Sequence, residues 1–183
     1  MNDGMMTVVQ CWDDGVTTDV RVGEILRKHN AKATFNLNAG LHDAKRKPGW
    51  VFKGTDVVRL GLDEMKDVYS GFTIANHSIT HPSLAKLPID AARRDIAEGR
   101  ERLQQFFGQP VLGFAYPNGS YNEEVMNAVR EAGHVYARTT LNVPQPFPPD
   151  NAMAFHPCCH FRLDARICGR VPAWVTSQVY DKA

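Results

Sequence analysis

The chain has 183 residues, of which 43% are hydrophobic, and its formal net charge is +1. This length and apolar content suit a single domain over residues 1–183 with a buried core. The near-neutral charge and the lack of a dense Lys/Arg cluster exclude the electrostatic pattern of nucleic-acid or membrane-surface binding. No run is apolar enough for a signal peptide or a membrane span, so the sequence predicts a cytoplasmic protein without a membrane partner.

Strands and helices alternate along the first half of the chain. The β-rich run "TVVQCW" ends at the acidic turn "DDG", and a stretch with helical periodicity follows. The basic stretch 43–50 contains a Pro-Gly pair and predicts a solvated loop. The elements predicted in this half are a strand at 7–12, a helix at 17–31, a strand at 33–40, a helix at 61–71 and a strand at 72–76.

The second half continues this alternation. It predicts a helix at 88–108, a strand at 111–116, a helix at 121–133, a strand at 134–139 and, after a proline-rich segment at 142–151, a strand-like pattern at 152–161. Repeated strand–helix units indicate an α/β fold with a parallel sheet or a (β/α) barrel. In both architectures the chemistry lies at the C-terminal ends of the strands.

Polar residues with chemical potential follow the predicted strands. Asp13 and Asp14 follow the first strand, and His77 and His81 follow the third. Histidines four residues apart on a helical turn or in a helical loop project to the same side. A carboxylate and two imidazoles at converging strand ends would make a three-ligand metal site with open positions, as in catalytic rather than structural zinc sites. In the alternative, "DDG" is a turn in which Asp13 caps the following helix.

Three segments of the chain resemble the polysaccharide deacetylase family, carbohydrate esterase family 4. "CWDDG", "NHSITHPSL" and "FAYPNGSYNEEV" match its first three motifs in order and rough spacing. The resemblance implies a distorted (β/α) barrel and hydrolysis of acetyl groups on sugars with one divalent metal, commonly Zn²⁺, with Co²⁺ or Ni²⁺ as alternatives. Asp13 matches the general base, and Asp14, His77 and His81 match the metal ligands. The short tail would leave the barrel incomplete or open, and a partner subunit, as in a homo-oligomer, could cover the gap.

The third motif departs from the family pattern. "AYPNG" has Ala115 in place of an arginine and Asn118 in place of a tyrosine. The family resemblance assigns the backbone N–H at the tyrosine position to an oxyanion hole, and the amide of Asn118 could still donate there. The family arginine pairs with the catalytic aspartate, and Arg138 after the next strand is the candidate substitute, unless it is an ordinary surface arginine. The fourth motif is not recognisable.

Two histidines compete for the family's general acid. His156 stands where a Leu-x-His motif is expected, whereas His160 follows two cysteines as in related Thr-Cys-His sequences. We favour His160, because Pro157 marks a turn directly after His156. An imidazole with a near-neutral pKa suits protonation of a leaving amine. The remaining histidines, expected at the surface or at helix ends, are His29, His42 and His134.

These features predict a metal-dependent hydrolase that cleaves the C–N bond of an acetylated sugar, or its O-acetyl ester. A first alternative is a hydrolase of another small amide, such as a cyclic imide, a ureide or a formamide, and the lack of an export signal favours it. A second alternative is a carbohydrate-binding pseudoenzyme. Asp13 argues against the latter, because binding alone requires no free carboxylate beside the metal ligands.

Overall fold

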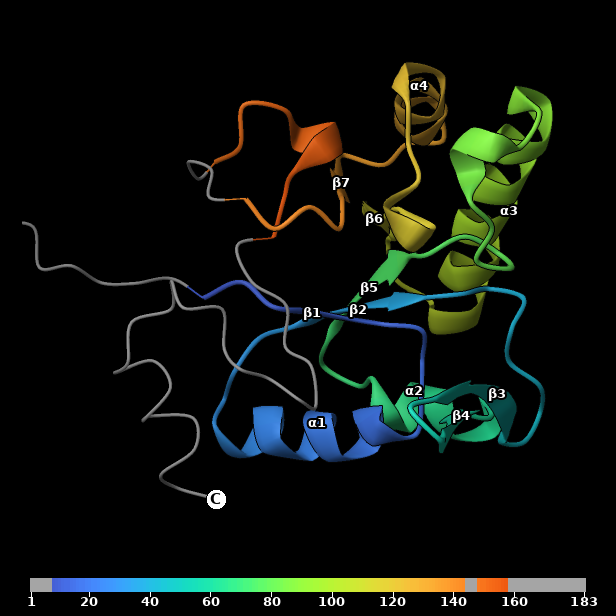
Figure 1. Cartoon of the computed structure of the whole chain (residues 1–183). Helices are drawn as coiled ribbons and strands as arrows, with labels where there is room; N and C mark the ends of the chain where they lie inside the picture. Colours follow the sequence, from blue (N-terminus) through green and yellow to red (C-terminus); the bar gives the residue numbers. More distant parts are fainter. Residues whose placement is uncertain (1–7, 144–147, 158–183) are drawn as a thin grey trace, which may run out of the picture.

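The computed structural model describes residues 8–143 and 148–157 (Figure 1). Its central feature is a five-stranded parallel sheet in the order β1-β2-β5-β6-β7. The strands are β1 (Cys11–Asp13), β2 (Thr34–Leu37), β5 (Thr73–Asn76), β6 (Gly113–Ala115) and β7 (Tyr136–Arg138). The sheet curls into part of a barrel, which confirms the predicted α/β class and distorted barrel.

Helices cover the sheet and follow the predicted alternation. Among the described residues no helix is both long and apolar enough to cross a membrane. Asn122 caps the last α-helix by accepting a hydrogen bond from the Val125 N–H, and Gly108 ends the longest in a left-handed conformation. The α-helices are α1 (Thr18–Lys28), α2 (Leu62–Val68), α3 (Ile89–Phe107) and α4 (Glu123–Glu131), with 3₁₀ turns η1 (Leu84–Lys86), η2 (Pro117–Gly119) and η3 (Ala152–Ala154).

Two clusters of apolar side chains pack the strands against the helices. One contains Phe35 of β2 and Ile74 of β5 with side chains from α1 and α2, and the other joins Phe114 of β6 to residues of α3 and α4. All three of these side chains are fully buried. Burial of a side chain of this size stabilises the fold by about 1.5–3 kcal/mol, so the sheet is a rigid support for the polar residues at its C-terminal edge.

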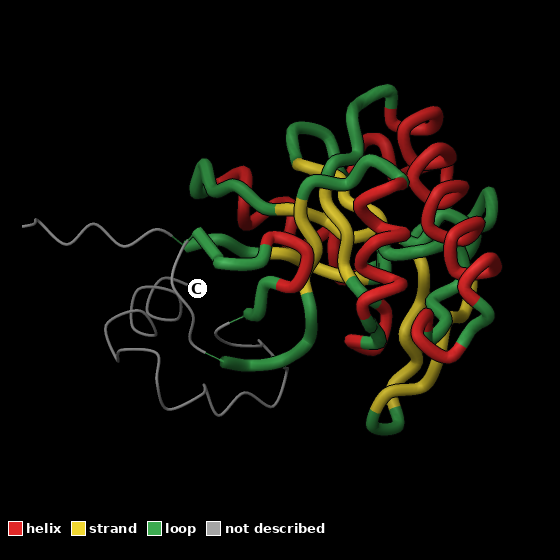
Figure 2. The backbone as a smooth tube through the Cα atoms, turned by 90° about the horizontal axis from the view of Figure 1, so that it is seen from above, coloured by secondary structure: helices red, strands yellow, loops and turns green. Residues whose placement is uncertain are grey.

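A β-hairpin begins within the stretch predicted as a solvated loop: residues 43–46 form an exposed loop as predicted, whereas the prediction was wrong for 47–50, which belong to a strand. Strands β3 (Lys47–Phe52) and β4 (Thr55–Arg59) pair antiparallel, with an irregularity next to Pro48 that accommodates the Pro-Gly pair. Lys53 and Gly54 both have positive φ, as a two-residue hairpin turn requires. The hairpin follows β2 in the chain and extends beyond the body of the domain (Figure 2).

Among residues 152–157, which the structure describes, most of the strand predicted at 152–161 does not form. Asn151 accepts a hydrogen bond from the Met153 N–H and starts the 3₁₀ turn η3, which replaces the first part of the strand. Only Phe155 pairs with the sheet, through an isolated parallel bridge to Arg138 of β7. Residues from 158 onward, including His160, lie outside the described part of the chain.

Candidate active site

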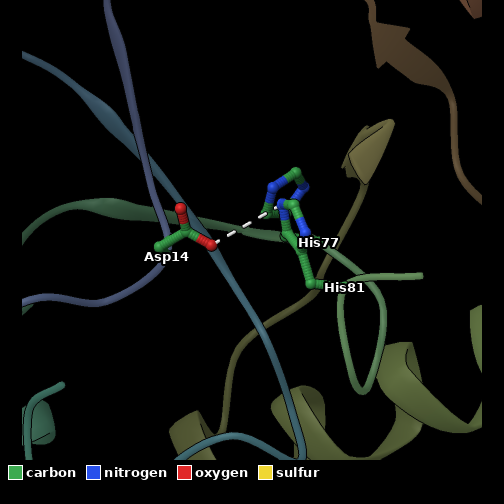
Figure 3. Close-up of side chains that lie close together, drawn as sticks. All are labelled: Asp14, His77 and His81. Carbon is green, nitrogen blue, oxygen red and sulfur yellow. Dashed lines mark ion pairs between the residues drawn. The ribbon is translucent and has the colours of Figure 1, made fainter. Parts of the chain in front are cut away.

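Three predicted metal ligands lie together at the C-terminal edge of the sheet (Figure 3). One ligand atom from each of Asp14, His77 and His81 lies within 4.8 Å of the other two. The Asp14 Oδ1 and His81 Nε2 atoms are 3.8 Å apart, and the two imidazole centroids are 4.7 Å apart. His77 is buried and the other two side chains are partly exposed, so the cluster has a buried side and a solvent-facing side.

Asp13 is the last residue of β1 and Asp14 is the first residue after it, and their side chains have different surroundings. The Asp14 N–H donates to the Asn36 carbonyl, and its φ of 79° is in the left-handed region that non-glycine residues rarely adopt. This conformation costs of order 1 kcal/mol and directs Asp14 toward the histidines. Asp13 does not cap α1: the capping position is held by Thr17, and the Asp13 carboxylate has other partners. The helix-cap alternative is therefore wrong.

The histidine segment is an irregular loop and not a helical turn. Ser78 and His81 have φ values of 69° and 59°, and the Ser78 Oγ accepts the His81 N–H. Asn76 holds the loop in place, because its Oδ1 accepts the Ser78 N–H while its Nδ2 donates to the Ile96 carbonyl of α3. A Cβ at Gly99 would lie 2.9 Å from the Asn76 Oδ1, so a glycine there permits this close helix–strand contact.

The chemistry of these side chains fits a divalent cation. The His77 Nδ1 lies 2.7 Å from the Ala115 carbonyl oxygen, which can only accept, so Nδ1 carries the hydrogen and Nε2 keeps its lone pair. Burial lowers the pKa of His81, and the neighbouring His77 lowers it further, which favours the neutral imidazole that metals bind. Asp14, His77 and His81 would hold the ion.

Asp13 lies beside this cluster as a second, separately held carboxylate. Its Oδ2 accepts a 2.5 Å hydrogen bond from the Arg138 Nη2, and its Oδ1 accepts one of 2.7 Å from the Asn36 Nδ2. Burial raises the pKa of the Asp13 carboxyl. Electrostatic interactions with His77 and Arg138 and the two hydrogen bonds lower it by more, so the pKa lies below its usual range. Arg138 is 6% exposed, which rules out the surface-arginine alternative.

A second buried arginine, which the sequence analysis did not single out, reaches the site from the hairpin. The Arg59 Nη1 donates to the Asp14 carbonyl at 2.7 Å and to the Asn38 Oδ1 at 3.3 Å. Asn38 in turn donates to the His77 carbonyl. The hairpin thus contacts the backbone of Asp14 directly and that of His77 through Asn38. Its sequence signal is a pair of short apolar runs, at 50–52 and 57–58, on either side of Lys53 and Gly54.

The remaining predicted residues lie at neighbouring strand ends. Asn118, with φ of 57°, follows β6, and its exposed side chain donates to the Ser83 Oγ at 3.3 Å. The His156 Nδ1 lies 2.6 Å from the Oγ1 of Thr139, the residue after Arg138. The structure therefore brings His156 to the same edge of the sheet, and His160 lies outside the described residues.

Of the three histidines expected at the surface or at helix ends, only His29 is placed as predicted, at the end of α1. His134 is buried, and its Nε2 lies 3.3 Å from the Asn76 Nδ2. Burial lowers the pKa of His134 to about 3, so the ring is a neutral acceptor that supports the histidine loop. His42 is partly buried, with its Nδ1 2.9 Å from the Leu60 carbonyl oxygen.

Comparison with known proteins adds to this geometry. A family model described as polysaccharide deacetylase matches residues 2–137. The protein YlxY of Bacillus subtilis is 32% identical over 107 residues, which are 58% of this chain and 29% of that protein. The structure of the Streptococcus pyogenes deacetylase PplD in complex with acetate has a TM-score of 0.67 at 21% identity, covering 80% of this chain and 61% of that one. A family 4 pseudoenzyme from Bacillus anthracis has a TM-score of 0.53 at 22% identity, covering 71% and 42%.

The identities to these two solved structures are low enough that the likeness shows the fold alone. The chain also spans less than two thirds of the length of each of these three proteins.

Proposed function

Because the chain belongs to the polysaccharide deacetylase family, we propose that it hydrolyses acetyl groups on a carbohydrate with the help of one divalent metal ion. In this proposal Asp14, His77 and His81 hold the ion. The ion is Zn²⁺ by preference and Co²⁺ or Ni²⁺ otherwise. The observation that carries the proposal is the convergence of three ligand atoms within 4.8 Å beside a separate carboxylate that an arginine holds. Without the second carboxylate, the three ligands could equally well belong to a site that only binds a metal ion or a ligand.

The two aspartates have different tasks. A divalent cation supplies Lewis acidity, which lowers the pKa of water and polarises an acetyl carbonyl. Asp13 takes the proton from the attacking water. Its low pKa keeps it ionised at neutral pH, and each oxygen, although already hydrogen-bonded, keeps a further lone pair for the water. Arg138 positions this carboxylate and takes the role of the arginine that the third motif lacks.

Two further roles complete the reaction. The backbone N–H of Asn118 donates to the oxygen that becomes negative as the carbonyl is attacked. A histidine after β7 protonates the leaving amine, and His160 stays our assignment for it, with His156 as the competitor that Thr139 holds at this edge of the sheet.

The alternatives use the same site differently. Hydrolysis of a cyclic imide, a ureide or a formamide would need the same ion and the same base. A carbohydrate-binding pseudoenzyme would keep the fold, as the Bacillus anthracis relative illustrates. The short contact between Arg138 and Asp13 favours an enzyme, because carbohydrate binding alone requires no positioned proton acceptor beside the metal ligands.

Acetate and ammonia release test the proposal. The wild type, loaded with Zn²⁺, Co²⁺ or Ni²⁺, is assayed on N-acetylglucosamine oligomers and on a panel of a cyclic imide, a ureide and a formamide, with ring opening followed for the imide. We expect metal-dependent acetate release that Asp13→Asn abolishes. Turnover of the small amides alone would replace the substrate assignment, and oligomer binding without turnover would establish the pseudoenzyme.

A further inference from the structure

Two aromatic side chains on the hairpin face solvent. Trp50 is 40% exposed and Phe52 is 42% exposed. They are two residues apart on β3 and therefore lie on the same face, roughly 7 Å apart along the strand. Val57 pairs with Trp50 across the hairpin, and Arg59 lies two residues beyond Val57, so the same face also carries Arg59.

This aromatic face continues into the candidate active site. The Arg59 guanidinium lies 5.1 Å from the Trp50 ring centroid, and its Nη1 donates to the Asp14 carbonyl. The base of β4 also runs beside the segment that follows Asp14: Arg59 forms an antiparallel bridge with Val16, and the Leu60 N–H donates to the Gly15 carbonyl. Arg59 therefore contacts both the indole and the backbone of a metal-ligand candidate.

The composition of the face indicates the chemistry of its ligand. A cation lies over one face of each ring, Arg59 at 5.1 Å from the Trp50 centroid and Lys53 at 5.7 Å from the Phe52 centroid, so a ligand would contact the other face. Apolar ring faces bordered by polar groups complement a pyranose, whose C–H faces carry partial positive charge and whose hydroxyls lie at the ring edge. A partner protein would more often cover an apolar interface core that is depleted of charged side chains, lysine above all.

We propose that Trp50 and Phe52 form a subsite for the sugar units next to the acetylated one, so that these two side chains set a preference for longer oligomers. This inference rests on the proposed function. The two side chains leave the strand roughly 7 Å apart, so each can contact a different sugar unit of one chain. Successive units of a chain could therefore stack on Trp50 and then on Phe52 while the acetyl group reaches Asp14.

The test compares substrates of different length. Acetate release and isothermal calorimetry are measured with N-acetylglucosamine oligomers of one to six units, and the activated ester 4-nitrophenyl acetate serves as a substrate without a glycan. Trp50→Ala and Phe52→Ala each remove one ring, and Phe52→Ala leaves in place the indole over which Arg59 lies. Val51→Ala is the matched control, because Val51 is 66% exposed on the opposite face of the same strand.

We expect Trp50→Ala to lower kcat/KM and affinity for the longer oligomers by about tenfold. The factor by which Trp50→Ala lowers kcat/KM on the ester should be at least about fivefold smaller than its factor on the longer oligomers. Val51→Ala should change every measured value by less than about twofold. Equal losses on the ester and the hexamer, or none with either aromatic variant, would overturn the subsite. A wild-type dimer that Trp50→Ala converts to a monomer would also overturn it, because a second copy would then cover the face. If the wild type binds oligomers in a Trp50-dependent way but releases no acetate, the deacetylase proposal fails and the subsite stands.

Discussion

Replacement of Arg138 by methionine tests whether this residue holds the catalytic carboxylate. Its side chain is 7% exposed and that of Asp13 is 33% exposed. A hydrogen bond between charged groups contributes about 1.5–3 kcal/mol, and loss of one partner from a fully buried pair costs about 3–5 kcal/mol. Because a third of the Asp13 side chain is in contact with solvent, we expect a coupling energy of about 2 kcal/mol between the two residues.

A double-mutant cycle measures this coupling. The free energy of unfolding in urea is determined for the wild type, Asp13→Asn, Arg138→Met and the double variant, with a chelator present to remove metal. In a protein of this size 2 kcal/mol corresponds to roughly 4–8 °C in Tm. Arg100→Met is the control, because Arg100 donates to the Val111 carbonyl and not to a carboxylate.

The catalytic readout separates positioning from general destabilisation. Arg138→Met should lower kcat by about tenfold or more while the dissociation constant for zinc changes by less than about threefold. Arg138→Lys should recover part of the rate, since it restores the charge but not the planar guanidinium. A coupling energy below about 0.5 kcal/mol, or an Arg138→Met variant with full kcat, would refute the positioning role.

Three further predictions concern other residues of the site and the fold. Asp14→Asn should weaken zinc binding about a hundredfold or more in competition with a chromophoric chelator, whereas Asp13→Asn should leave it within about fivefold; the reverse order would exchange their roles. Burial raises the pKa of Asp19 to about 7 from 3.8, so the native state retains a proton that the unfolded chain releases, and this group's stabilisation falls as pH rises through that window. Asp19→Asn should therefore gain up to about 4 kcal/mol relative to the wild type between pH 4 and pH 8 in urea unfolding, and a constant difference would contradict this pKa. His160→Ala should slow amide hydrolysis but spare an activated aryl ester, while His156→Ala should slow both modestly; the opposite selectivity would make His156 the acid.

The sequence predicted the parts of the site that depend on the ends of strands. Asp14, His77 and His81 could be placed together because parallel strands deliver their C-terminal residues to one edge, whatever the exact strand lengths. The support of these residues could not be predicted in the same way. Asn76 of β5 meets His134 of the loop before β7, and nothing local marks either of them as buried.

The hairpin was missed for a different reason. Pro48 and Gly49 are strong signals of a loop, yet they lie at a register irregularity of β3, and the pairing of Trp50 with Val57 begins directly after them. Arg59 then follows from that pairing, because it lies at the end of β4 where the hairpin returns to the sheet. No element was predicted for residues 51–60, so an arginine there gave no sequence signal of burial.

The pairing of Arg138 with Asp13 follows from the curvature of the sheet. β1 and β7 are the two outer strands of the five-stranded order, and in a flat sheet four interstrand spacings would separate them by roughly 19 Å. A 2.5 Å contact between residues 125 apart in sequence therefore requires that the curled sheet bring its two edges together at their C-terminal ends. In the family pattern the arginine belongs to the third motif, which here follows β6, whereas this chain carries it at the end of β7. The change of strand is sterically tolerable because β7 is the strand that curvature brings opposite β1. The same contact links the open edges of the partial barrel, so we infer that one ion pair serves both the closure of the fold and the orientation of the proposed base.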